Sequence, residues 1–125
     1  MDEHPNAIFV RTFIDDEETS IGEFVTDDVE WNFIGPIPPL HGKAEVVARY
    51  EGPPRSPGLK QTGQTTHDVV ANDTHAIALL QTTFQKGEET FTYRTAEIYH
   101  VRDGKISARW AFAEDTEAIN RFFGS

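Results

Sequence analysis

A glutamate inside an apolar, strand-forming segment is the strongest candidate for chemistry in this sequence. Glu97 lies between Ala96 and Ile98, where burying a carboxylate is unfavourable unless another group compensates its charge. In an apolar cavity a carboxyl group has a raised pKa and can serve as a general acid or base near neutral pH. The alternative is a structural glutamate that a neighbouring arginine neutralises.

His67 is the second candidate, because an imidazole titrates close to neutral pH. A histidine on a strand can equally well satisfy a local hydrogen bond and have no function. The histidines stand singly, and no cluster of His, Asp or Glu has the spacing of metal ligands. No glycine-rich phosphate loop precedes a helix either. We therefore expect neither a metal nor a cofactor.

Several large side chains are candidates for the walls of a pocket, although the same residues could simply form the core. Gln81 would add a polar contact if its strand face points inward, and Arg109 could recognise a polar group of a ligand together with Glu97. The candidate wall residues are Trp31, Phe33, Tyr50, Ile77, Leu79 and Tyr99.

The composition indicates one acidic domain spanning residues 1–125. The chain has 11 basic and 21 acidic residues and a formal net charge of −10, which disfavours nucleic acid and anionic membranes as partners. It has no cysteine, so disulfides and thiolate metal sites are excluded. The first residues lack the apolar run of a secretory signal, and no stretch is long enough to span a bilayer. We expect a cytoplasmic location.

The elements that must position these residues begin with helices. Pro5 suits the first turn of a helix, and a capping-box spacing between Ser20 and Glu23 predicts a second, short helix that ends near Thr26. A strand is predicted from Val29 to Phe33 and a third helix from about Lys43 to Glu51. Residues 52 to 63 are rich in proline and glycine, which favours a plain connector over a lid.

Four strand-forming runs follow, and they predict an antiparallel meander. The dipeptide Asp103-Gly104 is a strong hairpin signal between the last two runs. Asp115 can cap a final helix whose apolar stripe is Ile119, Phe122 and Phe123. The predicted strands are Gln64–Asn72, His75–Gln85, Glu89–Val101 and Lys105–Ala113.

Helices followed by one long, curled antiparallel sheet make an α+β fold. The helices would cover one face of the sheet. The other face carries enough apolar residues to need cover as well, and a second copy of the chain could provide it. We therefore expect a homodimer.

Three segments resemble SnoaL-like and ketosteroid-isomerase-like proteins of the NTF2-like superfamily. Asp28 to Tyr50 resembles their first strand and following helix, Tyr93 to Ile106 their last hairpin, and Trp110 to Phe123 their ending. The resemblance implies a cone with an apolar pocket for a small apolar or aromatic ligand. It also implies either a cofactor-free isomerase, cyclase or dehydratase, or a binding module without catalysis.

The chemical residues of these families are mostly missing from this chain. The general base of ketosteroid isomerases falls at or beside Phe33 and their phenol donor near Phe9, while Glu97 matches their protonated aspartate. The acid of epoxide hydrolases falls at Ala111 or Phe112. The carboxylates nearest to the acid of SnoaL-type cyclases are Glu114 and Asp115.

The register of the last hairpin decides what faces Glu97. A two-residue loop at Asp103-Gly104 sets Glu97 opposite Trp110, whereas a three-residue loop sets it opposite Arg109. The second register matches the family pattern, and we expect it. Such a pair is either structural or a recognition site for a polar group.

Overall fold

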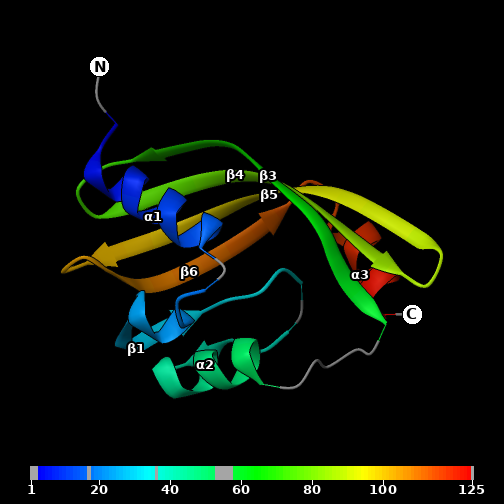
Figure 1. Ribbon diagram of the computed structural model, residues 1–125, viewed down its shortest axis with the longest axis horizontal. Coiled ribbons are helices and arrows are strands. Elements are labelled where there is room, and N and C mark those ends of the chain that lie inside the picture. The colour runs from blue at the N-terminus through cyan, green and yellow to red at the C-terminus, as the bar shows by residue number, and fades with distance from the viewer. Residues whose placement is uncertain (1–2, 17, 36, 53–57, 125) are drawn as a thin grey trace.

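The computed structural model describes residues 3–16, 18–35, 37–52 and 58–124, without the side chain of Phe123. It has three α-helices and a six-stranded sheet of order β2-β1-β6-β5-β4-β3 (Figure 1). The helices are α1 (Pro5–Asp15), α2 (Lys43–Glu51) and α3 (Thr116–Gly124). The strands are β1 (Val25–Trp31), β2 (Leu40–His41), β3 (Leu59–Ala71), β4 (His75–Lys86), β5 (Glu89–Arg102) and β6 (Lys105–Ala113).

The sheet combines the predicted meander with one parallel neighbour. β3, β4, β5 and β6 pair antiparallel in sequence order, and β1 lies parallel to β6. The sheet curls strongly, and α1 and α2 lie on its concave side (Figure 1). We call this side the inner face and the opposite side the outer face. At the far end of the inner face, α3 packs through Phe122, whose ring stacks on Phe91 at 5.1 Å.

Several of the predicted boundaries were wrong. The second helix is only a single 3-10 turn, Ile21–Glu23, because Ser20 accepts a hydrogen bond from the amide of Gly22 and the chain then enters β1. β1 begins four residues before Val29 and ends at Trp31. Part of the connector predicted for residues 52 to 63 belongs to β3, and residues 53–57 lie outside the described chain.

The core lies between α1, α2 and the inner face. Its most deeply buried side chains include Val10 of α1, Val46 of α2 and Ile106 of β6, each 0% exposed. Ala76 and Ala78 of β4 are also fully buried, because α1 packs against β3 and β4 and leaves room there only for small side chains. At the other end of the chain, Asp115 caps α3 as predicted, accepting a hydrogen bond from the amide of Ala118 at 2.9 Å.

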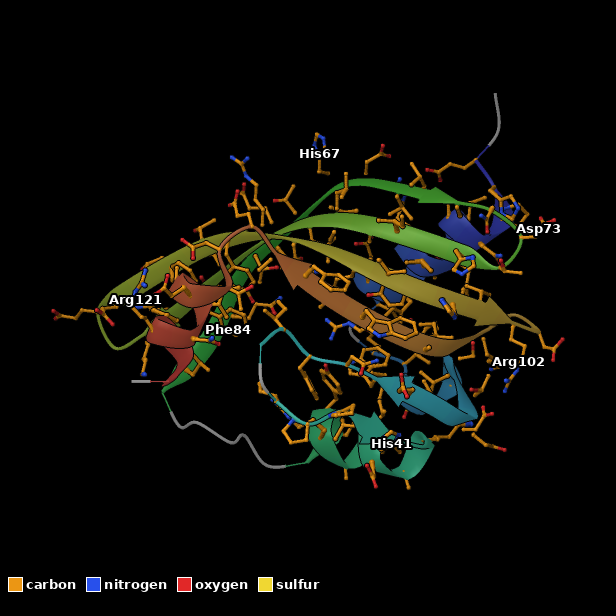
Figure 2. All side chains as sticks on the ribbon, turned by 180° about the vertical axis from the view of Figure 1, so that it is seen from behind. His41, His67, Asp73, Phe84, Arg102 and Arg121 are labelled. Atoms are coloured by element: carbon orange, nitrogen blue, oxygen red, sulfur yellow. The ribbon has the colours of Figure 1, made fainter. Side chains whose placement is uncertain are left out.

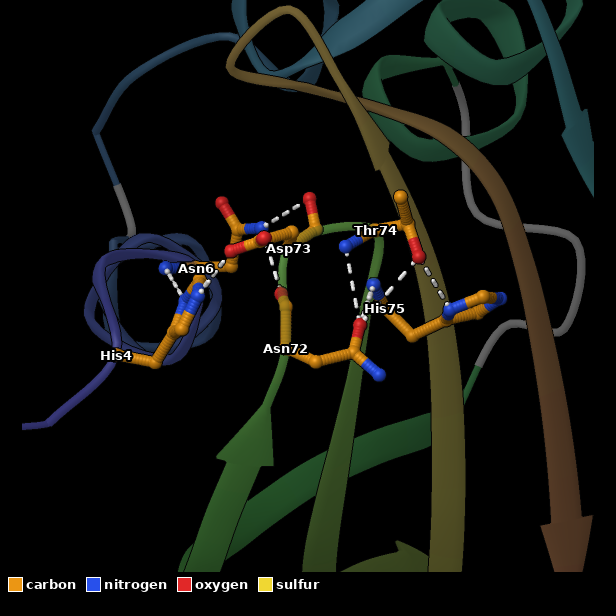
Figure 3. A network of polar contacts seen from close by, with 6 residues as sticks. All are labelled: His4, Asn6, Asn72, Asp73, Thr74 and His75. Atoms are coloured by element: carbon orange, nitrogen blue, oxygen red, sulfur yellow. Dashed lines mark hydrogen bonds and ion pairs between the residues drawn. The ribbon is translucent and has the colours of Figure 1, made fainter.

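A polar network fixes the first turn of α1 to the turn between β3 and β4 (Figure 3). His4 is the N-cap residue, and its Nδ1 accepts a hydrogen bond from the amide of Asn6 at 3.1 Å. Its Nε2 lies 2.9 Å from Oδ1 of Asp73. The side-chain amide of Asn6 donates to the backbone oxygens of Asn72 and Asp73. These contacts hold α1 across the inner face and so position the core that surrounds the site.

Within the described residues, no helix combines the length and the hydropathy that crossing a membrane requires.

Candidate functional site

A cluster of buried polar side chains lies on the inner face where β5 and β6 run side by side. Nη2 of Arg109 donates to Oε2 of Glu97 at 3.1 Å, and the hydroxyl of Tyr99 donates to Oε1 at 2.5 Å. The side chains of Arg109 and Glu97 are only 11% and 15% exposed. We call Trp31, Tyr50, Glu97, Tyr99 and Arg109 the inner cluster.

The predicted hairpin register was wrong, although it named the right pair of side chains. Asp103 and Gly104 both have positive φ, 52° and 74°, which makes a two-residue turn with Arg102 opposite Lys105. A bulge then adds Ser107 to β6, between the pairs His100–Ala108 and Val101–Ile106.

The bulge shifts the pairing by one residue. Glu97 therefore lies opposite Ala111, and Arg109 lies opposite Tyr99. Arg109 reaches Glu97 diagonally along the inner face, since residues two positions apart on a strand share a face.

Arg109 is held on several sides. Its Nη1 donates to the backbone oxygen of Asn32 at 2.9 Å, and its guanidinium lies 5.1 Å from the ring centre of Trp31. Burial opposes the positive charge, but the carboxylate of Glu97, with the nearby tyrosines, outweighs it and raises the pKa of Arg109. The arginine therefore stays charged at any physiological pH.

Aromatic side chains form the wall over this charged pair. The indole Nε1 of Trp31 donates to the hydroxyl of Tyr50 at 2.8 Å, and the ring of Phe33 stacks on Tyr50. Tyr50 is 44% exposed overall, while its hydroxyl end points inward to Trp31. The guanidinium of Arg49 lies over both Phe33 and Tyr50. The structure thus brings together three of the predicted wall residues, Trp31, Phe33 and Tyr50.

The tyrosines on the inner face keep their protons. Desolvation, and next the charge of Glu97, raise the pKa of Tyr99 well above 10.0 and that of Tyr93 to about 12. Desolvation also raises the pKa of Tyr50. Tyr99 is therefore a neutral phenol that donates its proton to the carboxylate of Glu97.

Two buried polar atoms of the inner face have no hydrogen-bond partner among the described residues. They are Oγ1 of Thr95 and Nε of Arg109. Thr95 was not among the site residues predicted from the sequence. The signal was present nevertheless, because Tyr93, Thr95, Glu97 and Tyr99 alternate along β5 and form a polar stripe on one face.

The structure does not bring the other predicted residues to the inner cluster. Ile77 and Leu79 are 37% and 39% exposed, and they lie with Gln81 on the outer face, opposite in parity to Ala76, Ala78 and Leu80. The prediction that they share a cavity with Glu97 was wrong. Both faces of β4 are apolar, so the sequence does not show which face lies inward. In the structure the small residues, Ala76 and Ala78, lie beneath α1.

His67 also lies away from Glu97. It is the extra residue of a bulge in β3, between the pairs Thr66–Leu80 and Asp68–Leu79, and it is exposed. Figure 2 shows its side chain pointing away from the sheet. A pairing of His67 with Glu97 in one catalytic site is therefore excluded in this structure.

A hollow of about 690 Å³ lies on the outer face, and His67 is at its side. Its apolar part is formed by Leu79, Ala96 and the 55%-exposed Phe112, and its polar part includes Arg94 and Glu114. We call it the outer hollow. Its lining also includes Leu80, Gln81, Thr95 and Ala113.

The described residues contain no group of three or more His, Asp or Glu side chains arranged to hold a metal ion. The sequence positions that were matched to the acids of the resembled enzymes add no further carboxylate to the inner cluster. Ala111 is buried opposite Glu97, Phe112 is exposed on the outer face, and Asp115 is the cap of α3.

Comparison with solved structures shows the same fold in several bacterial proteins. A protein from Jannaschia sp. CCS1, called a SnoaL-like polyketide cyclase, superposes with a TM-score of 0.71 at 14% identity, covering 96% of this chain and 95% of that one. An NTF2-like protein of unknown function from Mesorhizobium loti has a TM-score of 0.70 at 15% identity, with coverages of 92% and 100%. A protein from Kribbella flavida, called a ketosteroid isomerase, has a TM-score of 0.64 at 15% identity, with coverages of 87% and 77%.

These structural similarities establish an α+β fold of the NTF2-like type, with helices packed on a curved sheet. No curated protein matches the sequence. A family model, the SnoaL-like domain, matches residues 9–109, which include β1, α2 and the whole inner cluster. The chain belongs to the SnoaL-like domain family.

Proposed function

We propose that this SnoaL-like domain binds a small, mostly apolar or aromatic molecule on the inner face, and that the inner cluster holds its polar group. The observation that supports this most strongly is the charged pair of Glu97 and Arg109, buried behind the aromatic side chains of Trp31 and Tyr50. Buried polar groups with aromatic walls are the usual composition of a small-molecule site. The polar stripe of alternate residues between positions 93 and 99 of β5 provides further hydrogen-bonding groups.

Binding is favoured over acid–base catalysis because of what Glu97 already contacts. Both of its carboxylate oxygens accept hydrogen bonds, one from Tyr99 and one from Arg109. Proton transfer to Glu97 would remove its attraction to Arg109, whose pKa is raised and whose charge would then be buried alone. The ion pair with Arg109 therefore makes Glu97 a weaker general base.

An NMR titration with acetylnaphthalene, a flat and mostly apolar ketone, tests the binding proposal. We expect amide shifts to concentrate on β5 and β6 around residues 95–99 and 109–111. Glu97→Gln should weaken binding by loosening Arg109, while His67→Gln on the outer face should leave it unchanged. Shifts confined to the outer hollow, or no shifts at all, would refute the proposal.

A second candidate function is cofactor-free acid–base chemistry of the isomerase, cyclase or dehydratase type. It is favoured by the 2.5 Å contact between the hydroxyl of Tyr99 and Glu97, which joins a proton donor to an acceptor in a buried place. Such a site should exchange the acidic methyl protons of acetylnaphthalene with deuterated water. Loss of this exchange in Glu97→Gln, with binding unchanged, would support an enzyme. An absence of exchange in the wild type would reject catalysis of this type and favour binding without catalysis.

We also propose that the outer face forms a homodimer. It exposes Val70, Ile77, Leu79 and Phe112, each between 37% and 55%. Two copies that each carry a net charge of −10 repel one another, so their contact must be apolar or electrically balanced. The outer hollow meets both conditions, because its lining combines apolar side chains with one basic and one acidic residue, Arg94 and Glu114.

The molar mass of the protein, measured by light scattering after size-exclusion chromatography, tests the dimer directly. Phe112→Ser should lower the molar mass from two chains to one, whereas Ile8→Ser, at a residue 52% exposed on α1, should not. A wild type that is monomeric at all concentrations would reject the proposed interface. The single domain over residues 1–125 and the cytoplasmic location stay predictions.

A further inference from the structure

Two histidines lie directly opposite one another on the outer face of the sheet. His75 of β4 is paired with His100 of β5, and the centres of their rings are 4.4 Å apart. Opposite residues of antiparallel strands point to the same side, so both imidazoles project from the outer face. His75 is exposed and His100 is half-buried. The two residues are far apart in the sequence, and only the pairing of β4 with β5 brings them together.

The hydrogen bonds of His75 leave one of its ring nitrogens free to bind a ligand. The hydroxyl of Thr74 lies 2.8 Å from Nδ1 of His75 and donates its own proton to Oδ1 of Asn72 (Figure 3). Because a hydroxyl has a single proton, its oxygen accepts the proton of Nδ1. The neutral ring therefore has its lone pair on Nε2. Hydrogen bonds of this kind orient the histidine ligands of many metal sites.

The ring of His100 is available as well. The hydrogen bond from the hydroxyl of Ser107 goes to the backbone oxygen of His100, and among the described residues the ring nitrogens have no partner. The ring lies against His75 and, at 4.8 Å between ring centres, near Trp110. A neutral imidazole nitrogen from each histidine can thus be directed at one point on the surface.

The separation of the two rings fits a single metal ion. Metal–imidazole bonds of about 2.0–2.1 Å place each ring centre about 3.2 Å from the ion. The two centres are then about 4.5 Å apart when the bonds meet at a right angle, and about 5.2 Å apart at the tetrahedral angle. The distance of 4.4 Å between His75 and His100 agrees with the right angle. Right angles are typical of Cu²⁺ and Ni²⁺, whereas structural Zn²⁺ sites are tetrahedral.

We propose that His75 and His100 together bind one divalent transition-metal ion with right-angle coordination, Cu²⁺ most tightly, and that water occupies its remaining positions. Cu²⁺ has the highest affinity of the divalent first-row metals for nitrogen ligands, and the net charge of −10 favours a cation. The site needs no third protein ligand, and the described residues contain no larger group of ligands. It revises the expectation from the sequence that no metal binds, and it is independent of the function proposed for the inner face.

Titration of the untagged protein with Cu²⁺ tests the site, with calorimetry for the affinity and tryptophan fluorescence for the position. We expect one ion per chain and quenching of Trp110, which lies beside His100. His75→Gln and His100→Gln should each weaken binding at least about tenfold, because the second ligand then no longer holds the ion at the first. His67→Gln is the matched control, since His67 is an exposed histidine that is unpaired in β3, and it should change nothing.

Two further variants separate the site from other parts of the protein. His4 is a second candidate ligand for Cu²⁺, so the titrations are repeated in His4→Asn, which can still accept the hydrogen bond from the amide of Asn6. Phe112→Ser, designed to be monomeric, should bind Cu²⁺ as the wild type does, because both ligands come from one chain. Loss of binding in either variant would overturn the site.

Electron paramagnetic resonance of the copper-bound protein should show two nitrogen ligands. A single nitrogen, or a wild-type affinity in His75→Gln or His100→Gln, would overturn the proposal. Equal weakening by His67→Gln would also overturn it, because the ion would then bind at scattered surface histidines. Tighter binding of Zn²⁺ than of Cu²⁺ would reject the right-angle geometry on which the choice of metal depends.

Discussion

Arg109 and Glu97 form a buried ion pair between strand positions that are not opposite one another. Arg109 is paired with Tyr99 in the sheet and Glu97 with Ala111, yet the guanidinium reaches the carboxylate at 3.1 Å along the inner face. The bulge at Ser107 creates this diagonal arrangement. Each buried charge is therefore compensated by the other, and the stability of the fold depends on both being present.

Breaking this pair should destabilise the fold strongly. Arg109→Met leaves Glu97 without a counter-charge in a place where its side chain is 15% exposed, and we expect a loss of about 3 kcal/mol in the free energy of unfolding. The double variant Glu97→Leu with Arg109→Met should lose less than the sum of the single changes, because no unpaired charge remains. Urea denaturation measures the free energy of unfolding of the two single variants and of the double variant.

The exposed pair of Arg102 and Asp28 provides the comparison. Its atoms are as close as 2.6 Å, but its side chains are 54% and 68% exposed. Arg102→Met should therefore have a much smaller effect than Arg109→Met. Equal effects of the two substitutions would show that the pair of Glu97 and Arg109 is not buried in solution.

Alkaline pH should weaken the fold through the tyrosines. Desolvation and then the charge of Glu97 raise the pKa of Tyr93 and Tyr99 in the folded chain above the ordinary value of 10.0. The folded state then holds protons that the unfolded state has already lost. This contribution is complete below pH 10.0 and is lost as pH rises through that value toward the raised pKa.

A comparison of Tyr99→Phe with the wild type isolates this effect. The wild type should lose stability above pH 10.0 by up to about 1.4 kcal/mol per pH unit for each such tyrosine. Tyr99→Phe should be less stable at neutral pH, since Glu97 loses a hydrogen bond, but should decline less steeply in alkali. Parallel curves for the two proteins would contradict the assignment. Ultraviolet titration of the phenols gives an independent measurement.

Much of the fold follows from local signals in the sequence. The Asp103-Gly104 turn, the cap at Asp115 and the alternation along β5 each correspond to a feature of the structure. Alternation placed Glu97 and Tyr99 on one face, since successive side chains of a strand point to opposite sides. The aromatic residues of β1 and α2 joined them because those elements pack on that same face.

Other features leave no clear pattern in a single sequence. The bulge at Ser107 adds one ordinary residue to a strand, and only the pairing partner reveals it. β4 is apolar on both faces, so its alternation does not show that Ala76 and Ala78 face inward while Ile77 and Leu79 face outward. The close approach of α1 decides this, and that is a tertiary contact.

Acidic pH should weaken the fold through His100. Its ring lies against His75 at 4.4 Å and near Trp110 at 4.8 Å on the outer face. Desolvation, and next the neighbouring His75, lower the pKa of His100 below 6.5. The unfolded chain then binds a proton more readily than the folded one. The contribution is complete above pH 6.5 and is lost as pH falls toward the lowered pKa.

Urea denaturation between pH 7 and pH 5 measures this contribution. We expect the wild type to lose stability over this range, and His100→Phe to show a flatter profile. His41→Phe is the control, because His41 is exposed at the end of β2, just before α2 (Figure 2), and its replacement should leave the profile of the wild type unchanged. An identical slope in His100→Phe and the wild type would show that His100 does not contribute.

His4 should have a defined tautomer, because each ring nitrogen has a different neighbour. Nδ1 accepts a hydrogen bond from the amide of Asn6 and must be unprotonated, so the neutral ring carries its proton on Nε2 and donates it to Asp73 (Figure 3). Nitrogen chemical shifts of the ring should report this tautomer at neutral pH. A ring protonated on Nδ1 would contradict the cap.

Removing the cap should also have a measurable effect on stability. His4→Ala deprives α1 of its N-terminal acceptor, and we expect a loss of about 1 kcal/mol in the free energy of unfolding. His4→Asn can still accept from the amide of Asn6 and should recover most of that loss. If both substitutions have the same effect, the contact with Asp73 rather than the cap is what stabilises α1. Because α1 covers the buried alanines of β4, His4→Ala should also speed hydrogen exchange at Ala76 and Ala78.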